Sequence, residues 1–481
     1  MKFFGRTELL AQLRDLWGKR VSSLVTCRGR RRIGKSTLIE RFATQSKARF
    51  IKLEGLKPQA GTTKEDELDS FAEQLAAQTG AESSRPESWL HAFIRLSKEI
   101  DGHQRTVVLL DEASWMAHGD PLFAATLKVA WDNYLKKHDR LILVVCGSVS
   151  VWIKENILES GAFFGRRSLD MVVPELPLGE CVKFWGEAAS RVATREIVDV
   201  LSVTGGVPRY LEEVDPGLSA RENIRRMFFL PNAPLRVDFD EMFKDAITRQ
   251  PKFSGEVLRC LVDGPRNLTE IARTLGVAKG GNITNAIAQL EESGMVASDF
   301  GRNPETGAEV RERRYRLRDN YSRFYLKYVE PSKSAIDRGT FAFSGLEQFA
   351  GWESIMGLQF ENLVVNNLRE LLKALHMDKV MITSAAPWMK RGSASAGTKG
   401  CQIDLLVQSR MSMCLVEIKR QSHIGREIIE EVREKCASLP RPGGVSLRTA
   451  LVFDGELAAS VEADGFFDAV IPFSSLLMAQ Y

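Results

Sequence analysis

Short, continuous runs of apolar residues in the first third of the chain predict a sheet of buried parallel strands. The runs occupy residues 23–27, 107–110 and 141–146, and each is too short to form a core helix. Strands of a parallel sheet read as continuous apolar runs because helices cover both faces of the sheet. Apolar residues at helical spacing follow the first run, in residues 37–42. The pattern therefore predicts an α/β core.

A glycine-rich segment joins the first predicted strand to the first predicted helix. It fits the phosphate loop G-x-x-x-x-G-K-[ST], in which backbone N–H groups close around the β-phosphate of a nucleotide at the start of a helix. Lys35 would reach the β and γ oxygens, and the hydroxyl of Ser36 would bind Mg²⁺. We expect ATP or GTP here, although a glycine-rich turn matches by chance in some chains. The expected nucleotide-binding residues are Gly29, Arg30, Arg31, Arg32, Ile33, Gly34, Lys35, Ser36 and Thr37.

Polar residues follow the other two predicted strands and would lie at the same edge of the sheet. We expect Asp111 to hold Mg²⁺ through water and Glu112 to polarise the attacking water, although the pair could simply cap the next helix. Ser148 is the expected sensor of the γ-phosphate. Arg166 is expected to touch the transferring phosphoryl group, from its own or a neighbouring subunit. The alternative for Arg166 is a solvated surface position.

Composition indicates a large protein whose cysteines are reduced rather than paired in the disulfides of a secreted protein. The chain has 481 residues, of which 44% are hydrophobic and 27% charged, enough for about three cores. Its seven scattered cysteines read as reduced thiols, and no C-x-x-C pair or histidine cluster suggests zinc. No uncharged stretch approaches the roughly 18 residues that span a bilayer, so we expect a soluble cytoplasmic protein. The net charge of +4 confines nucleic-acid contacts to local patches.

Residues 249–330 carry the pattern of a winged helix-turn-helix. Helices are expected at 255–262, 268–275 and 282–293, followed by strands at 295–300 and 310–317. The third helix would bury an apolar stripe and present polar residues to a DNA groove. Alternation in the last strand would place three arginines on one face to grip phosphates. Many such modules instead mediate protein contacts, and an arginine strand can simply protect a sheet edge.

The side chains that these expectations assign are as follows. The apolar stripe of the third helix would be Ile283, Ile287 and Leu290. The groove-facing residues would be Lys279, Asn282, Asn285 and Gln289, and the arginines of the wing would be Arg314, Arg316 and Arg318.

The last part of the chain carries a second set of acidic residues inside apolar strands. Asp404 and Glu417 interrupt the predicted strands 402–407 and 413–419, where an unpaired carboxylate would be costly. Period two places Glu417 and Lys419 on one face of the strand, and a neighbouring strand brings Asp404 to that face. Glu361, on a helix expected over 357–374, would complete a site for one or two Mg²⁺ ions. Taken alone, Glu-x-Lys on a strand is typical of a solvated face.

The order of motifs in the first 330 residues resembles that of the archaeal-type ATPases, relatives of the AAA+ and STAND groups. By this resemblance, Gly206 and Pro208 lie against the adenine from a helical lid, and residues 4–8 flank the base. The motifs that carry it are Phe4-Gly5-Arg6, the loop at 29–36, Leu109-Leu110-Asp111-Glu112, Trp131-Asp132, Gly147-Ser148-Val149-Ser150, Gly165-Arg166 and Gly205-Gly206-Val207-Pro208.

The C-terminal part resembles the PD-(D/E)xK nuclease superfamily, a module that also accompanies the archaeal-type ATPases. Glu361, Asp404, Glu417 and Lys419 match the pattern residue by residue. Gln402 departs from it, since this position is often acidic in relatives, and some relatives of this fold only bind DNA. Lys419 would orient the nucleophile or stabilise the transition state.

Together these patterns predict an α/β protein with a P-loop NTPase parallel sheet, a helical lid, a winged helix-turn-helix and a restriction-endonuclease-like domain. The expected boundaries are 1–174, 175–248, 249–330, a linker at 331–351, and 352–481. The expected function is an ATP- and Mg²⁺-dependent ATPase that binds DNA and cleaves it under nucleotide control. The alternative is a nucleotide switch whose nuclease-like domain is only a docking module. A homo-oligomer is expected if Arg166 acts across subunits.

Overall fold

The computed structural model describes residues 3–100, 102, 104–147, 150–247, 249–299, 301–310, 313–390, 392 and 400–478. The chain divides into two compact units. The first unit consists of Gly5–Glu175 and Met242–Thr248, and the second of Met1–Phe4, Leu176–Glu241 and Arg249–Tyr481. The residues expected to form the lid, the winged helix-turn-helix and the nuclease-like domain therefore belong to the second unit, except Glu175 and Met242–Thr248 of the expected lid.

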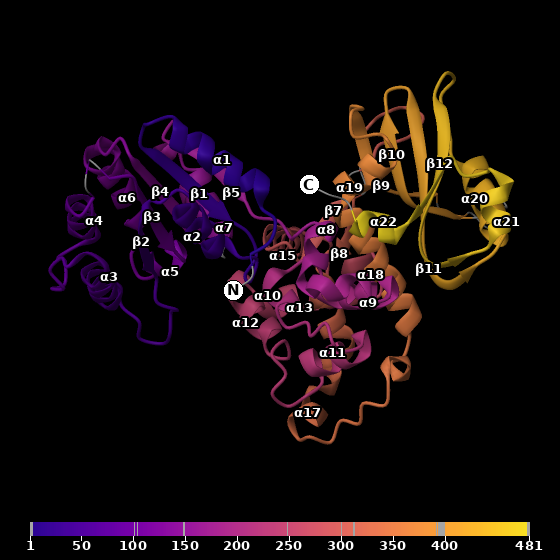
Figure 1. Ribbon diagram of the computed structural model, residues 1–481, viewed down its shortest axis with the longest axis horizontal. Helices are drawn as coiled ribbons and strands as arrows, with labels where there is room; N and C mark the ends of the chain where they lie inside the picture. The colour runs from indigo at the N-terminus through magenta and orange to yellow at the C-terminus, as the bar shows by residue number, and fades with distance from the viewer. Residues whose placement is uncertain are drawn as a thin grey trace. The chain divides into compact units, whose positions relative to one another are not determined.

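The first unit is built on a five-stranded parallel sheet in the order β2-β3-β4-β1-β5 (Figure 1). Its two central neighbours β3 and β4 are buried along their whole length, as expected for strands covered on both faces. The three apolar runs thus form strands, which confirms the prediction of an α/β core. The strands are β1 (Ser23–Arg28), β2 (Arg49–Glu54), β3 (Thr106–Asp111), β4 (Leu141–Gly147) and β5 (Arg167–Val172).

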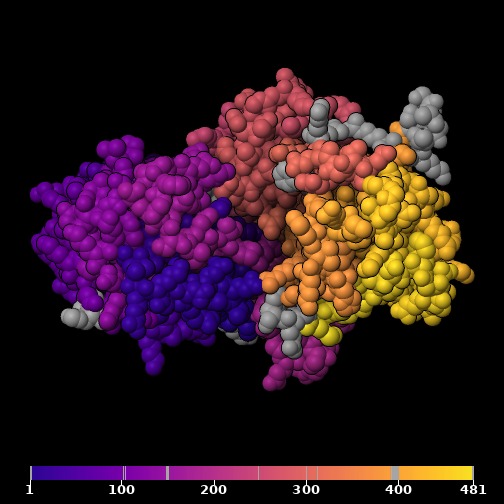
Figure 2. Space-filling model, turned by 90° about the horizontal axis from the view of Figure 1, so that it is seen from above, coloured from indigo at the N-terminus to yellow at the C-terminus, as the bar shows by residue number. Residues whose placement is uncertain are grey.

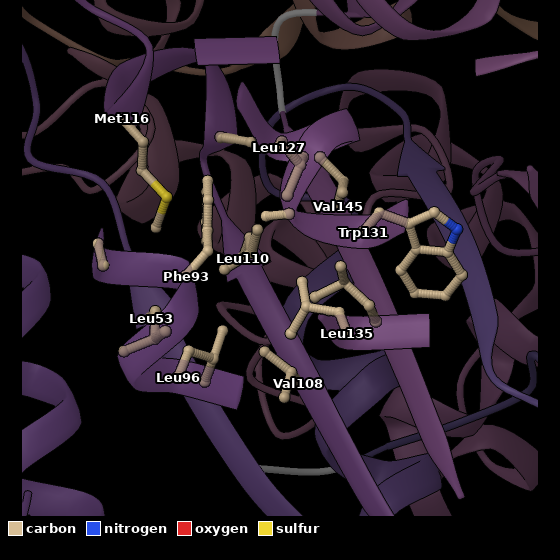
Figure 3. Packing of buried hydrophobic residues seen from close by; sticks show 14 of the residues in the cluster. Leu53, Phe93, Leu96, Val108, Leu110, Met116, Leu127, Trp131, Leu135 and Val145 are labelled. Atoms are coloured by element: carbon tan, nitrogen blue, oxygen red, sulfur yellow. The ribbon is translucent and has the colours of Figure 1, made fainter. Parts of the chain in front are cut away.

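Helices of the first unit pack apolar side chains against this sheet. Leu53, Val108, Leu110 and Val145 from the strands meet side chains of α4 and α6 in one buried cluster, in which Phe93 is fully buried (Figure 3). Burial of this area is the main favourable term in folding the unit. The helices are α1 (Thr7–Gly18), α2 (Lys35–Gln45), α3 (Lys64–Thr79), α4 (Trp89–Lys98), α5 (Ala113–Met116), α6 (Phe123–Asn133) and α7 (Ser150–Ile153).

The second unit begins with short helices. They are α8 (Leu178–Cys181), α9 (Thr194–Thr204), α10 (Pro208–Leu211), α11 (Ala220–Phe228) and α12 (Asp238–Ala246), whose residues from Met242 onward are grouped with the first unit. Pro208 stands at the first position of α10, where its missing N–H costs no hydrogen bond. Ser219 begins α11 by accepting a hydrogen bond from the N–H of Glu222.

Three helices and a small antiparallel sheet follow, in the order β6-β8-β7. A reciprocal capping box between Asn267 and Glu270 starts the second helix, and Gly276 at φ 66° ends it. The elements are α13 (Pro251–Arg259), β6 (Arg266–Asn267), α14 (Leu268–Leu275), α15 (Gly281–Glu292), β7 (Val296–Asp299) and β8 (Arg314–Leu317). The expected elements are therefore present, with strands shorter than predicted.

The expected linker at 331–351 is wrong in its first part, because α16 (Asn320–Phe324) is followed by the helix α17 (Glu330–Asp337). The remainder is held by aromatic packing. The rings of Phe341 and Phe349 stack on Phe229, with ring centroids 5.2 and 5.1 Å apart. These ring contacts anchor the segment, although its loose sequence pattern predicted a linker.

The last part of the second unit is a mixed five-stranded sheet in the order β13-β12-β11-β10-β9. β9, β10 and β11 pair antiparallel, whereas β11, β12 and β13 pair parallel. The strands are β9 (Ile382–Lys390), β10 (Cys401–Ser409), β11 (Ser412–Ile424), β12 (Ser446–Leu457) and β13 (Ala469–Pro472). Their yellow residues and the orange residues that precede them form a continuous surface in the space-filling view (Figure 2).

The helix expected over 357–374 is two helices. Asn367 interrupts it with a non-helical backbone, and its amide side chain accepts a hydrogen bond from the N–H of Leu178. The helices are α18 (Trp352–Asn366), α19 (Leu368–Ala374), α20 (Glu427–Ser438), α21 (Ala459–Asp464) and α22 (Phe473–Leu477). Within the part of the chain that the structure describes, no helix is both long and apolar enough to cross a bilayer. None of the seven cysteines, all of which lie among the described residues, forms a disulfide.

Candidate functional site

Two glycines shape the loop between β1 and α2. Gly29 has a φ of 152°, and a Cβ at this position would lie 2.6 Å from the carbonyl oxygen of Val173. Gly34 has a φ of 84° and directly precedes α2. Both positions therefore require glycine, the first for close approach and the second for its left-handed backbone. The loop ends at the amino terminus of α2, where backbone N–H groups favour an anion.

Lys35 lies folded across this loop. Its Nζ donates hydrogen bonds to the carbonyl oxygens of Gly29 and Arg30 at 3.1 and 3.2 Å, and the residue is only 6% exposed. The two carbonyl oxygens satisfy an ammonium group that a nucleotide phosphate would bind more strongly, because a phosphate oxygen carries negative charge. The lysine is thus held at the position from which the motif requires it to act.

Ser36 and Asp111 meet at the edge of the sheet. The hydroxyl of Ser36 donates a hydrogen bond of 2.6 Å to the carboxylate of Asp111. Nζ of Lys52 lies 3.4 Å from the same carboxylate; burial opposes the charge on Lys52, but Asp111 and Glu54 outweigh it and raise the pKa of the ammonium. A hydroxyl and a carboxylate are ligands that Mg²⁺ prefers, so these two residues fit the expected metal.

Glu112 has a strained backbone for a residue other than glycine, with φ 49° and ψ 48°. It directly precedes α5, but its side chain makes no capping hydrogen bond. The backbone of Gly55 packs closely against this residue, since a Cβ there would lie 2.8 Å from the carbonyl oxygen of Glu112. Helix capping therefore does not explain Glu112, and the candidate general base stays a prediction.

Arg166 is held by a carboxylate on α6. Its Nε donates to the Oδ1 and Oδ2 atoms of Asp132 at 2.8 and 3.1 Å. Hydrogen bonds from this guanidinium, and from Lys128, lower the pKa of Asp132 to about 2. Asp132 and Arg166, which belong to two separate motifs of the sequence, are thus joined by an ion pair. Ser148, the expected γ-phosphate sensor, lies outside the described residues.

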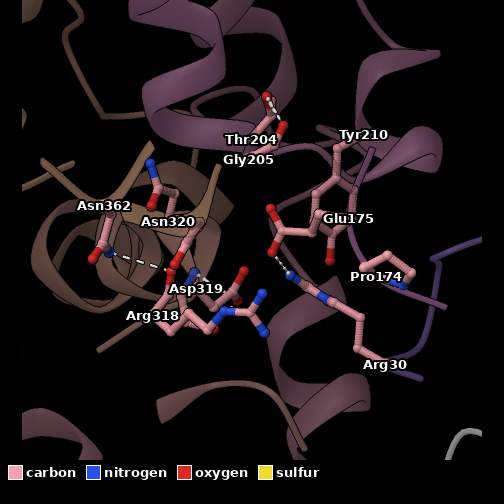
Figure 4. Close-up of polar contacts among 12 residues, drawn as sticks. Arg30, Pro174, Glu175, Thr204, Gly205, Tyr210, Arg318, Asp319, Asn320 and Asn362 are labelled. Carbon is pink, nitrogen blue, oxygen red and sulfur yellow. Dashed lines mark hydrogen bonds and ion pairs between the residues drawn. The ribbon is translucent and has the colours of Figure 1, made fainter. Parts of the chain in front are cut away.

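The arginines of the loop bind acidic and apolar partners. Arg30 lies 3.9 Å from the carboxylate of Glu175 (Figure 4), and its Nη2 contacts the sulfur of Met242 at 3.1 Å. Arg31 pairs with Asp245 of α12. Sequence reasoning did not assign these contacts, because the acids lie far from residues 29–36 in the chain.

Arg6 is a further residue that the motifs did not single out for this role. Its buried guanidinium donates to the carbonyl oxygens of Pro174, at 2.6 Å, and of Ile33, at 3.1 Å. It therefore joins the phosphate loop to the end of β5. Of the residues expected near adenine, Gly206 accepts a hydrogen bond from the N–H of Leu176 at 2.7 Å, and Pro208 begins α10. Their role stays a prediction, as does that of residues 4–8.

Helix α15 presents the polar face that the sequence predicted. Ile283, Ile287 and Leu290 are buried, whereas Lys279, Asn282 and Asn285 are exposed. Gln289, also expected to face a groove, accepts a hydrogen bond from the N–H of Arg249 instead.

The three arginines expected on one face of the wing, two of which lie on β8, do not form one exposed face, so this expectation is wrong. Arg316 is 9% exposed, and its guanidinium binds Asp299, Asn362 and Asn366. Arg314 pairs with Glu270. The carbonyl oxygen of Arg318 accepts a hydrogen bond from Asn362 (Figure 4). The alternation along the strand did not predict exposure, because α18 covers the face of β8 that would be open in an isolated hairpin.

In the last sheet Glu417 is fully buried and surrounded by ammonium groups. Both of its carboxylate oxygens accept from Nζ of Lys435, at 2.8 and 2.6 Å, and Oε1 also lies 2.9 Å from Nζ of Lys419. Glu431 of α20 lies 3.0 Å from each lysine, which closes a ring of alternating charges. Burial raises the pKa of Glu417 to about 7, with Asp404 adding to the effect.

Asp404 and Glu361 lie beside this ring. One carboxylate oxygen of Asp404 accepts the N–H of Ile418 at 2.9 Å. Burial and the charge of Glu361 raise the pKa of Asp404 to about 6, and burial also raises that of Glu361. The four predicted residues of the nuclease-like site are therefore brought together. They line a cleft of about 800 Å³ with Glu431 and Lys435.

Lys435 and Glu431 were missed by sequence reasoning. The only signal was their i, i+4 spacing on α20, which is common on exposed helices. The carboxylates have the chemistry that Mg²⁺ prefers, but in the present arrangement Lys435 engages both oxygens of Glu417. With the side chains so placed, no three carboxylate, histidine or cysteine side chains among the described residues form a metal-binding group.

Comparison with known proteins identifies the first part of the chain. Residues 3–214 match the ATPase domain found predominantly in Archaea, so this part is an ATPase domain of the archaeal type. An uncharacterized protein of Methanocaldococcus jannaschii is 22% identical over 438 residues, which cover 90% of both chains.

Two solved structures are similar to this chain. A Walker-type ATPase of Pyrococcus abyssi is 17% identical with a TM-score of 0.50, and the match covers 67% of this chain and 96% of that one. The ORC2 protein of Aeropyrum pernix, solved in ADPNP-ADP complexes, is 13% identical with a TM-score of 0.43, over 70% of this chain and 95% of that one. The fold is that of an α/β P-loop NTPase, with a second, mixed sheet in the C-terminal part.

Proposed function

We propose that this protein binds and hydrolyses ATP, binds DNA, and cleaves it in an Mg²⁺-dependent reaction that the nucleotide controls. The observation that carries the proposal is that Glu361, Asp404 and the fully buried Glu417 line one cleft of a chain that begins with an ATPase domain. Three carboxylates whose pKa values are raised by burial and mutual repulsion are costly to maintain for stability alone, which supports a chemical role.

In the ATPase step, Lys35 would leave the loop carbonyls for the β and γ oxygens of ATP. Ser36 and Asp111 would hold Mg²⁺, which supplies positive charge to the phosphate oxygens as the γ-phosphoryl group is transferred. Glu112 would orient and deprotonate the attacking water. Arg166, positioned by Asp132, would stabilise the developing charge, and an action in trans would require a homo-oligomer.

DNA would contact α15 rather than the arginine strand. The exposed residues Asn282 and Asn285 lie on the first half of this helix, from which side chains reach base edges in helix-turn-helix proteins, and the exposed Lys279 lies just before it. Arg316 contributes to the fold instead, because its guanidinium is already bound by Asp299 and two asparagines.

A second candidate function is a nucleotide switch whose nuclease-like module only docks on DNA or on a protein. One observation favours it: Lys419 and Lys435 already neutralise Glu417, so the cleft is self-contained without a metal ion.

The two candidates differ in DNA cleavage. Purified protein is incubated with linear and circular DNA in Mg²⁺ or Mn²⁺, with and without ATP, beside Asp404→Ala and the control Asp464→Ala, which alters a carboxylate on α21 outside the cleft lining. Metal-dependent cleavage that ATP alters and Asp404→Ala abolishes supports the nuclease. DNA that stays whole under every condition, while ATP is hydrolysed, supports the switch.

A further inference from the structure

The ammonium group of Lys435 occupies the place where a divalent cation would meet Glu417. It contacts both carboxylate oxygens, at 2.8 and 2.6 Å, whereas Lys419 contacts only one. A carboxylate that is fully buried needs a counter-charge, and here an amino-acid side chain provides it. A metal ion bound by these two oxygens would therefore have to displace Lys435.

Lys435 has a second partner to which it can retreat. Oε1 of Glu431 lies 3.0 Å from its Nζ, and Glu431 stands one turn earlier on the same helix. Lys435 can thus release Glu417 without becoming an unpaired buried cation, and its flexible four-carbon stem allows the small displacement. The charge of Lys435 also acts to lower the pKa values of Asp404 and Glu361, which burial raises, but its two hydrogen bonds to a cleft carboxylate both go to Glu417.

We propose that Lys435 is an internal cation that closes the metal site of the C-terminal cleft, and that a divalent metal ion binds only when Lys435 moves from Glu417 to Glu431. This inference rests on the proposed nuclease function. Lys435 is a positioning residue in this account, because it acts on the metal site through Glu417.

Direct measurement of metal binding tests this competition. Nucleotide-free full-length protein is titrated with MnCl₂, and free Mn²⁺ is followed by electron paramagnetic resonance. Lys435→Met keeps the stem without the charge and is expected to bind Mn²⁺ at least about tenfold more tightly than wild type. Lys435→Arg keeps the cation and is expected to resemble wild type. Lys333→Met, which removes the partner of Asp240 elsewhere in the unit, is the matched control and should change nothing.

The variant Asp404→Asn is combined with each of these backgrounds. It separates the hypothesis that a metal ion binds at this cleft from the hypothesis that Lys435 competes with that ion. If Asp404→Asn weakens binding but Lys435→Met matches wild type, the metal site stands and the competition is overturned. If Lys435→Arg tightens binding as much as Lys435→Met, loosening rather than charge is the cause, and the competition is again overturned. If Asp404→Asn has no effect in any background, no metal binds at this cleft, and the proposed nuclease function fails as well.

Discussion

The hydroxyl of Ser36 donates a 2.6 Å hydrogen bond to the carboxylate of Asp111, which lies 75 positions later in the chain. The contact joins the end of the phosphate loop to the end of β3 at one edge of the sheet. It places the two expected Mg²⁺ ligands together before any nucleotide is bound.

Replacing Ser36 by alanine removes one of these ligands and leaves the loop backbone intact. We expect Ser36→Ala to weaken ATP binding about tenfold in the presence of Mg²⁺ and to leave binding in EDTA unchanged, because the hydroxyl acts through the metal. Titration with a fluorescent ATP analogue measures both affinities. Ser46→Ala, at the other end of α2, is the control. An equal loss with and without Mg²⁺ would show that Ser36 acts on the fold rather than on the metal.

Replacement of Glu112 is expected to affect ATP hydrolysis but not ATP binding. We expect Glu112→Gln to slow ATP hydrolysis by at least about 100-fold while the affinity for ATP changes little, because a general base acts on the attacking water. Steady-state phosphate release and a binding titration measure the two effects. Glu87→Gln, an exposed exchange near the start of α4, should leave both unchanged. Normal hydrolysis in Glu112→Gln would exclude this residue as the base.

Glu67 makes the stability of the ATPase domain depend on pH. It is buried on α3, and burial raises its pKa from 4.5 to about 7. The folded state therefore holds this proton more tightly than the unfolded chain. The stabilising contribution of the proton is full below pH 4.5 and is lost as the pH rises through about 7. We expect Glu67→Gln to match wild type near pH 5 and to raise the free energy of unfolding by up to about 3 kcal/mol at pH 8.

Urea-induced unfolding at the two pH values measures this difference. Glu65→Gln alters an exposed carboxylate on the same helix and is expected to show no pH-dependent gain. An equal effect of Glu67→Gln at pH 5 and pH 8 would mean that the carboxyl group does not change its ionisation in this range.

A buried ion pair links α9 to the strand that carries the nuclease-like motif. Arg420, next to Lys419 on β11, contacts Asp199 at 2.5 Å and is 8% exposed. We expect Asp199→Ala to destabilise the protein by about 3 kcal/mol, because it leaves a buried guanidinium without this partner. Arg209→Ala, which breaks the more exposed pair with Glu213, should cost less than about 1 kcal/mol. Equal unfolding midpoints of the two variants would contradict the account.

Features encoded by neighbouring residues were predictable from the sequence. The loop at 29–36 needs Gly29, Gly34, Lys35 and Ser36 at fixed spacing, and the strand before it and helix after it are marked by local periodicity. The acidic residues inside β10 and β11 were equally visible, because alternation along a strand is a local property.

Features that depend on distant packing were not predictable in this way. Arg316 was expected at the surface, but α18 supplies Asn362 and Asn366 from about 50 positions later. Lys435 was missed because it reaches Glu417 only through the packing of α20 against β11, which the sequence pattern does not reveal. The i, i+4 pattern that it shares with Glu431 is the same on a solvated helix.

The most direct test of the central assignment is the affinity for ATP of Lys35→Ala, measured beside wild type and the exposed control Lys19→Ala. The account predicts that Lys35→Ala binds ATP at least about tenfold more weakly and loses hydrolysis, because the lysine that contacts the β and γ oxygens is gone. Lys19→Ala should match wild type. Unchanged ATP affinity in Lys35→Ala would contradict the assignment of residues 29–36 as the phosphate loop.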